Sequence, residues 1–225
     1  EHYSDVRPKR VTRPGERPLT ALKNRGVEYV EIRNTDINPF LPMGIDTQQA
    51  LFLDTFLISC LLLDEQDICA AECRMVSNNT QKVITRGRQP GLRLATPAGE
   101  FPLIEVGNSL LDQMLGTAEL LNEVHDTNAY SKALDAQLQK LHHASETPSA
   151  KVLGELRATG LNYTQWILQK SREHRETFGQ LSSAAQVYQD LTQRARASLK
   201  EQQQLEASDT QSFDDFLKEF LALEI

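Results

Sequence analysis

The chain has 225 residues, of which 40% are hydrophobic and 24% are charged, and its formal net charge is −7. These values are ordinary for a soluble globular protein of one or two domains, and they exclude a fibrous chain and a wholly disordered one. The acidic balance argues against a general affinity for polyanions, so we expect no nucleic acid and no membrane among the partners.

The longest apolar run, over residues 50–63, is interrupted by Asp54, Thr55 and Ser59. It therefore predicts a buried helix rather than a membrane span. No signal peptide is visible, so we expect a cytoplasmic location. The sequence begins with Glu1 rather than Met, and we expect the chain to be part of a longer polypeptide.

Strand signals lie near the start of the chain. The basic segment 6–13 contains Pro8, which predicts an edge strand or a loop rather than a central strand. A proline and a glycine bracket a short helix over residues 18–25. Residues 27–33, Val-Glu-Tyr-Val-Glu-Ile-Arg, predict a second strand.

Beyond this region the apolar spacing is mainly helical. A loop is expected over residues 38–44, and a helix begins at Asp46, with Gln49 completing a capping box. Further helices are predicted over residues 68–85, 103–124, 128–143, from Ser149 to Gly160, 163–178, 183–207 and in a terminal segment that begins at Asp209 or Ser212. Four residues of the terminal helix are expected to face inward: Phe213, Phe216, Leu217 and Phe220. Residues 87–102 predict an irregular loop with a short extended piece at 92–95.

The three cysteines, Cys60, Cys69 and Cys73, are too few for a disulfide scaffold. Cys69 and Cys73 would share a helical face, but no second His or Cys pair stands nearby to complete a metal site. We expect reduced thiols, with Cys60 in the core. The histidines His125, His142, His143 and His174 are expected at surfaces or helix ends.

The strand over residues 27–33 carries the most specific chemical signal. Because side chains alternate along a strand, Tyr29, Glu31 and Arg33 would share one face. A carboxylate on a stiff strand suits Mg²⁺, and a guanidinium beside it suits phosphate oxygens. The pair would serve phosphoryl transfer, which depends on positioning and charge neutralisation. The alternative is a plain ion pair on the surface of one strand.

A basic cluster precedes this strand. Arg7, Lys9 and Arg10 could contact phosphates or carboxylates, or they could belong to a solvated loop. The residue pattern assigns no individual role to any of them.

Several segments carry a family resemblance. They are Arg7-Pro8-Lys9-Arg10, Gly26-Val27-Glu28-Tyr29-Val30-Glu31-Ile32-Arg33, Asp36-Ile37-Asn38-Pro39-Phe40, Arg86-Gly87-Arg88-Gln89-Pro90-Gly91-Leu92 and Ala207-Ser208-Asp209-Thr210. In this order they resemble the carboxy-terminal part of the bacterial glutamate–cysteine ligases. The similarity is strong up to about Phe40 and looser in the helical remainder.

This resemblance implies a fold and a reaction. The expected class is α+β, with the terminal strands of a glutamine-synthetase-like antiparallel sheet in residues 1–44 and a helical region in residues 45–225. The implied enzyme joins the γ-carboxyl of L-glutamate to the amino group of L-cysteine through a γ-glutamyl phosphate. That reaction is the first step of glutathione biosynthesis, with ATP as co-substrate and Mg²⁺ as cofactor.

The resemblance also assigns roles. Glu31 matches a glutamate that binds Mg²⁺, Arg33 matches a catalytic arginine that contacts the ATP phosphates, and Tyr3 matches a tyrosine that binds cysteine. The family's other metal-binding glutamates precede the region matched here. We therefore expect the isolated chain to be inactive and its partner to be the amino-terminal half of the same enzyme.

Two other functions are compatible with the residues. The long polar helices would also suit a helical interaction or scaffolding module. A related carboxylate–amine ligase with a different amine acceptor is the second alternative.

Overall fold

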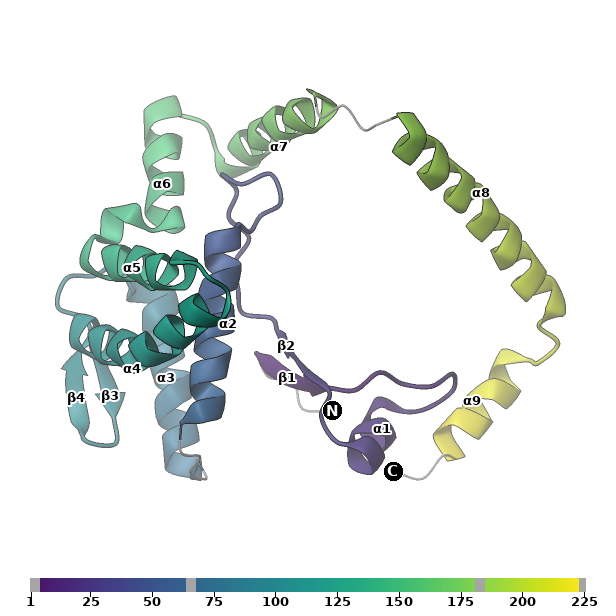
Figure 1. Ribbon diagram of the computed structural model, residues 1–225, viewed down its shortest axis with the longest axis horizontal. Coiled ribbons are helices and arrows are strands. Elements are labelled where there is room, and N and C mark those ends of the chain that lie inside the picture. The colour runs from purple at the N-terminus through teal and green to yellow at the C-terminus, as the bar shows by residue number, and fades with distance from the viewer. Residues whose placement is uncertain (1–4, 64–67, 181–184, 223–225) are drawn as a thin grey trace. The chain divides into compact units, whose positions relative to one another are not determined.

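The computed structural model describes residues 5–63, 68–180 and 185–222. It is mostly helical with two antiparallel two-stranded sheets, which confirms the expected α+β class. The chain divides into two compact units, one of residues 38–177 and one that combines residues 1–37 with residues 178–225. Figure 1 shows the order of the elements along the chain.

The unit of residues 38–177 holds most of the helices. Its elements are α2 (Thr47–Leu62), α3 (Ala70–Arg86), β3 (Arg93–Thr96), β4 (Gly99–Pro102), α4 (Leu103–Val124), α5 (Ala129–His142), the 3-10 helix η1 (Ala144–Glu146), α6 (Pro148–Thr159) and nearly all of α7 (Tyr163–Gln180). The other unit contains β1 (Val6–Lys9), α1 (Pro18–Arg25), β2 (Tyr29–Ile32), α8 (Ala185–Ser208) and α9 (Phe213–Ala222).

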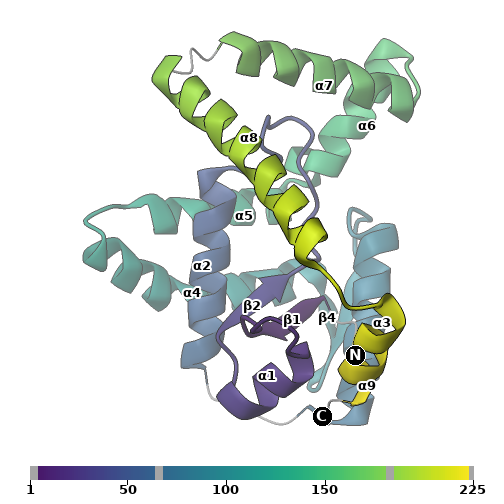
Figure 2. The ribbon, with the colours of Figure 1, turned by 90° about the vertical axis from the view of Figure 1, so that its right-hand side faces the viewer.

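A hydrophobic core lies where α2, α4 and α5 meet (Figure 2). Its buried residues recur at helical spacing on α4 and α5, and they are Leu111, Met114, Ala118, Tyr130 and Leu134. A Cβ atom on Gly107 of α4 would lie 2.6 Å from Cδ2 of Leu141 on α5. A side chain at position 107 would therefore have to displace the Leu141 side chain from its present place.

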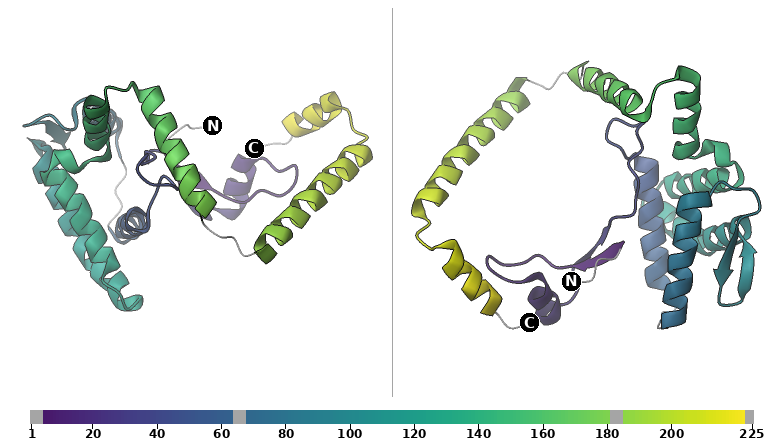
Figure 3. Two further views of the ribbon diagram at one scale, coloured as in Figure 1. Left: turned by 90° about the horizontal axis from the view of Figure 1, so that it is seen from above. Right: turned by 180° about the vertical axis from the view of Figure 1, so that it is seen from behind.

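The β3–β4 hairpin is held against α3, as the view from behind in Figure 3 shows. The Asn79 side chain bridges to the backbone of Ala95. Its Nδ2 donates to the Ala95 carbonyl at 2.7 Å, and its Oδ1 accepts from the Ala95 amide at 3.0 Å. The expectation of an irregular loop over residues 87–102 was wrong for β4. Two prolines and a two-residue turn leave too few residues for a visible alternation.

The loop after β2 is anchored on α7. The Phe40 ring packs edge-on against Trp166, with 5.7 Å between ring centroids, and Trp166 is only 1% exposed. Nε2 of His174 lies 2.9 Å from the Pro39 carbonyl oxygen. The Trp166 Nε1 donates to the Glu155 carboxylate at 2.7 Å. His174 therefore has a local structural partner inside this unit, so the expectation of a surface residue holds only in part.

The predicted start of α2 is confirmed, and the predicted start of α6 is wrong. Asp46 caps α2, since its carboxylate accepts from the Gln49 amide at 2.8 Å. The predicted cap Ser149 of α6 was wrong. Thr147 is the cap, and its hydroxyl accepts from the Ala150 amide at 3.4 Å. Proline suits the first position of a helix, so Pro148 shifts the start two residues upstream.

The unit that holds β1 and β2 has little core of its own. Among its described residues, Ala21 is the only buried hydrophobic one. The expectation that α9 faces inward was wrong, since Phe213 is 72% exposed and Phe216 is 43% exposed. Cys60, expected in the core, is also exposed on α2. Amphipathic spacing identifies an apolar face, but it does not show whether the face is covered.

None of the helices within the described ranges is both long and apolar enough to cross a membrane.

Replacing Asn79 with alanine should loosen the hairpin. Both backbone groups of Ala95 would lose their partner, which costs roughly 1–3 kcal/mol. We expect a lower free energy of unfolding and faster exchange of the Ala95 amide hydrogen. Asn78→Ala is the control, because the Asn78 side chain is exposed and forms no hydrogen bond within the described part of the chain. Equal losses in both variants would contradict this prediction.

Replacing Phe40 with alanine should release the 38–44 loop from α7. Truncating a half-buried phenylalanine should cost about 2 kcal/mol, toward the low end for large core residues. The chain has a single tryptophan, so the emission of Trp166 reports the change directly and should shift to longer wavelength. Phe178→Ala on the same helix, 43% exposed, is the matched control. Unchanged emission in Phe40→Ala would count against the packing role.

Candidate functional site

The antiparallel pairing of β1 with β2 defines one polar face. Arg7 lies opposite Glu31, and Lys9 lies opposite Tyr29. Side chains of opposed residues share a face of the ribbon, and Arg33 follows two residues after Glu31 on that same face. The four-residue strands are shorter than the predicted extended segments, but backbone hydrogen bonds continue the pairing at both ends.

Glu31 is the centre of this face. Arg33 donates to both of its carboxylate oxygens, from Nε to Oε1 at 2.8 Å and from Nη2 to Oε2 at 3.2 Å. The Lys9 Nζ lies 3.0 Å from Oε2. The side chains of Glu31 and Arg33 are 33% and 45% exposed. The predicted same-face position of Glu31 and Arg33 is confirmed, and the structure adds Lys9 as a third member.

These contacts determine the charge state of the site. The hydrogen bonds from Arg33, and then that from Lys9, hold the pKa of the Glu31 carboxyl below its ordinary value of 4.5. Glu31 is therefore ionised at neutral pH and can accept hydrogen bonds or bind a cation. The two cations beside it leave a positive balance that favours anionic oxygens.

The segment between the strands is fixed by a second ion pair. Arg25 donates from Nη1 and Nη2 to the two oxygens of Glu16, both at 2.7 Å, and from Nη2 to the Val11 carbonyl at 2.8 Å. The Arg25 hydrogen bonds are the largest cause of the lowered pKa of Glu16, which is about 2. This pair ties α1 to the loop that follows β1.

The residues around Glu31 offer few ligands for a metal ion. Within the described ranges, no group of three or more His, Cys, Asp or Glu side chains could hold an ion. Glu31 offers one carboxylate, and its neighbours on the ribbon face are cations. Mg²⁺ in proteins often takes one or two carboxylates together with substrate phosphates and water. Glu31 therefore fits the role of a single ligand to an ion held mainly by phosphates.

The other residues predicted for the site are Tyr3 and the basic cluster of Arg7, Lys9 and Arg10. Tyr3 lies outside the described residues. The basic cluster separates, since Lys9 contacts Glu31 while Arg10 lies 3.6 Å from the Glu28 carboxylate. The sequence analysis gave Lys9 no individual role. The register of β1 against β2 shows that Lys9 lies near Glu31, but the helix and turn between the two strands make that register invisible in the sequence.

Comparisons with known proteins find similarity to glutamate–cysteine ligases. The family model for glutamate–cysteine ligase matches residues 1–83. Over 222 residues the chain is 43% identical to a glutamate–cysteine ligase of Azotobacter vinelandii and 42% identical to one of Pseudomonas fluorescens. Each match covers 99% of this chain and 42% of the relative, so the chain spans less than half the length of these relatives.

A solved structure gives the same result for the fold. A crystal structure of glutamate–cysteine ligase from Francisella tularensis in complex with AMP matches with a TM-score of 0.87 and 32% identity. The match covers 97% of this chain and 43% of that protein, and the chain aligns with the carboxy-terminal part of its relatives. In sequence and in fold, the chain is therefore similar across nearly its whole length to the carboxy-terminal part of bacterial glutamate–cysteine ligases.

Proposed function

We propose that the chain supplies one wall of the active site of an ATP-dependent ligase that joins L-glutamate to L-cysteine. The observation that carries this proposal is the Glu31 carboxylate held between Lys9 and Arg33 inside the segment that the ligase family model matches. In this reaction a γ-carboxylate oxygen of glutamate bonds to the terminal phosphorus of ATP, the bond from that phosphorus to the bridging oxygen breaks, and ADP leaves. The cysteine amine then attacks the acyl phosphate, an amide bond forms, and phosphate leaves.

Arg33 is the catalytic residue of this chain in the proposal. Its guanidinium would contact the phosphates of ATP and stabilise charge on the phosphoryl group in transfer. Lys9 is close enough to the same carboxylate to act on the same phosphates. Both side chains are already ordered by Glu31, so little side-chain freedom remains to be lost on binding.

Glu31 is the proposed Mg²⁺ ligand. When bound, Mg²⁺ would neutralise charge on the phosphate oxygens. Glu31 would contribute a single carboxylate oxygen or both, and the other ligands would come from ATP, from water and from residues outside this chain. Tyr3 is proposed to bind the cysteine substrate through its hydroxyl group.

The proposed partner is a segment that corresponds to the remaining, amino-terminal part of the relatives, on the same polypeptide or as a second chain. Residues 1–44 would then complete the catalytic sheet, and residues 45–225 would pack on it. Exposed apolar side chains in the unit that contains β1 and β2, called the ribbon unit from here on, support this. Val30 is 45% exposed, Leu191 is 60% exposed and Phe213 is 72% exposed. Exposed apolar surface of this extent is typical of an interface. Such an enzyme would work in the cytoplasm, where ATP and reduced cysteine are available.

The isolated chain should show no ligase turnover. One carboxylate cannot hold the metal ions and both substrates, so phosphate release in the presence of ATP, glutamate and cysteine should equal the background. A chimera should restore it, in which this chain replaces the matching 222 residues of the Azotobacter vinelandii relative. In that chimera, Glu31→Gln and Arg33→Ala should each lower kcat at least about 100-fold.

The matched control in the chimera is Glu119→Gln, which removes an exposed carboxylate of α4 and should leave kcat unchanged. Circular dichroism and the melting temperature check that each variant folds. Near-normal turnover in Glu31→Gln and Arg33→Ala would leave only the scaffolding function. Faster reaction with an amine other than cysteine would favour the related ligase.

The titration of Glu31 in the isolated chain tests whether Arg33 and Lys9 contact its carboxylate in solution. Because its folded pKa lies below its ordinary 4.5, its contribution to stability is present above that value and is lost as the pH falls through the folded pKa. NMR of the side-chain carboxyl carbon should show the lowered midpoint. Arg33→Gln should raise the midpoint most and Lys9→Met less, whereas Lys132→Met on α5 should leave it unchanged. A midpoint insensitive to Arg33→Gln would show that the pair does not form in solution.

A further inference from the structure

The groove between α3 and the β3–β4 hairpin is lined by three cations, Arg74, Lys82 and Arg86, and by one carboxylate, Glu100. Residues 73–99 contain no Asp or Glu and five cations, which are Arg74, Lys82, Arg86, Arg88 and Arg93. This segment carries +5, so the rest of the chain must carry −12 to give the net charge of −7. Positive charge gathered on one part of an acidic chain is an electrostatic signal for an anionic ligand.

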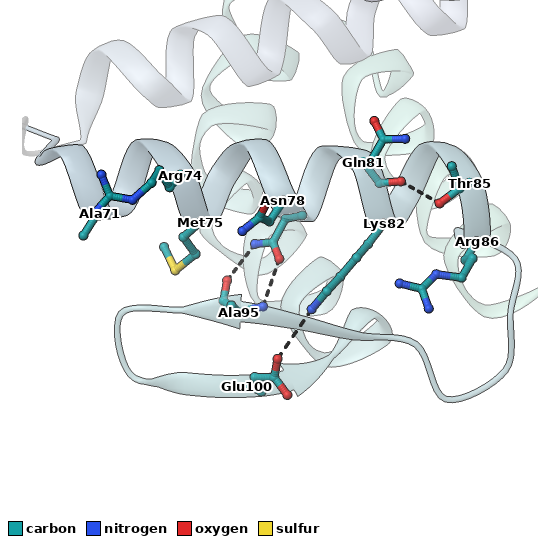
Figure 4. Close-up of a pocket in the computed structure, with 11 residues that line it drawn as sticks. Ala71, Arg74, Met75, Asn78, Gln81, Lys82, Thr85, Arg86, Ala95 and Glu100 are labelled. Carbon is teal, nitrogen blue, oxygen red and sulfur yellow. Dashed lines mark hydrogen bonds and ion pairs between the residues drawn. The ribbon is translucent and has the colours of Figure 1, made fainter.

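The groove has a volume of about 510 Å³. Figure 4 shows Lys82 and Arg86 extending from α3 toward the hairpin, with Arg74 nearer the other end of the helix. The Asn79 side chain bonds both backbone groups of Ala95 in β3. This double hydrogen bond sets the spacing between α3 and β3. A defined contact therefore fixes the distance between the helix and the strand that border the groove.

The two arginines that line the groove, Arg74 and Arg86, have no side-chain partner in the described part of the chain. Lys82 contacts the Glu100 carboxylate at 3.4 Å, but no ion pair or hydrogen bond is formed by the side chains of Arg74 or Arg86. The chain has 31 carboxylate residues and 24 lysines and arginines, so acidic partners are not scarce. Leaving two arginines unpaired beside one cavity is consistent with recognition of an external anion.

We propose that this groove binds a small phosphate-bearing molecule of the size of a sugar phosphate. Lys82 and Arg86 stand four residues apart on α3 and both extend toward the hairpin, so one phosphate can reach both. Arg74 lies twelve residues from Arg86, about 18 Å along the helix, and lines the other end of the groove. The exposed carboxamide of Asn78 offers neutral hydrogen bonds, and Met75 offers apolar contact to a sugar ring. The volume lies within the range of roughly 300–1,000 Å³ that is usual for small-ligand sites. These residues are separate from Glu31 and Arg33, so the proposal does not rest on the ligase reaction.

The test is an NMR titration of the ¹⁵N-labelled 225-residue chain at low salt. The probe is ribose 5-phosphate, with inorganic phosphate and neutral ribose as separate arms. We expect saturable shifts of the amides around Lys82, Arg86 and Ala95. Ribose 5-phosphate should bind more tightly than inorganic phosphate if the sugar contacts the groove, and binding of inorganic phosphate alone would overturn the sugar phosphate as ligand. Ribose alone should cause no shift.

Charge-removing variants complete the test. Arg86→Gln should weaken binding about tenfold or more, as expected for hydrogen bonds to a charged group, whereas Arg74→Gln, at the other end of the groove, should weaken it less. Arg157→Gln removes an exposed arginine of α6 and should leave the affinity unchanged. The amide spectrum of each variant shows that it folds. The proposal would be overturned if binding of ribose 5-phosphate does not saturate, or if Arg157→Gln weakens that binding as much as Arg86→Gln does. It would also be overturned if an RNA oligonucleotide binds and ribose 5-phosphate does not.

Discussion

The constraint on which the functional site depends is the register of two short antiparallel strands. Pairing Arg7 with Glu31 brings Lys9 within 3.0 Å of the Glu31 carboxylate, while strand alternation brings Arg33 within 2.8 Å of it. A slip of one residue would move every side chain of one strand to the opposite face and separate the group. The ion pairs themselves are half-exposed and contribute little stability, so their importance lies in position and charge state rather than in folding energy.

Much of this arrangement could be predicted from residue type and spacing. Alternation alone places Glu31 and Arg33 together, and capping chemistry places the start of α2 at Asp46. The partner strand of the hairpin at Gly99–Pro102 could not be predicted, because four residues that end in a proline carry no measurable period. The pairing of Lys9 with Glu31 is a non-local contact across a helix, and no local pattern encodes it.

The errors in burial share one physical cause. Hydrophobic spacing shows which face of a helix is apolar, and in α4 and α5 that face is covered by packing around Met114. The same spacing in α9 leaves Phe213 and Phe216 exposed, because no described element covers them. A periodic sequence thus predicts a surface that needs a partner, but only the fold shows whether the partner lies within the same unit.

The two units of the chain consequently differ in what stabilises them. The helical unit has a core around Met114 and Leu134, and a tryptophan buried to 1% exposure fastens the loop that begins at Asn38. The ribbon unit carries the proposed catalytic residues but buries almost no apolar surface among its described residues. Any partner that covers its apolar faces would bind the folded ribbon and not an unfolded one, so association would also stabilise the geometry around Glu31. Assembly of the candidate site and ordering of β1 and β2 would then be a single equilibrium, and the chemistry of the site would depend on association with the partner.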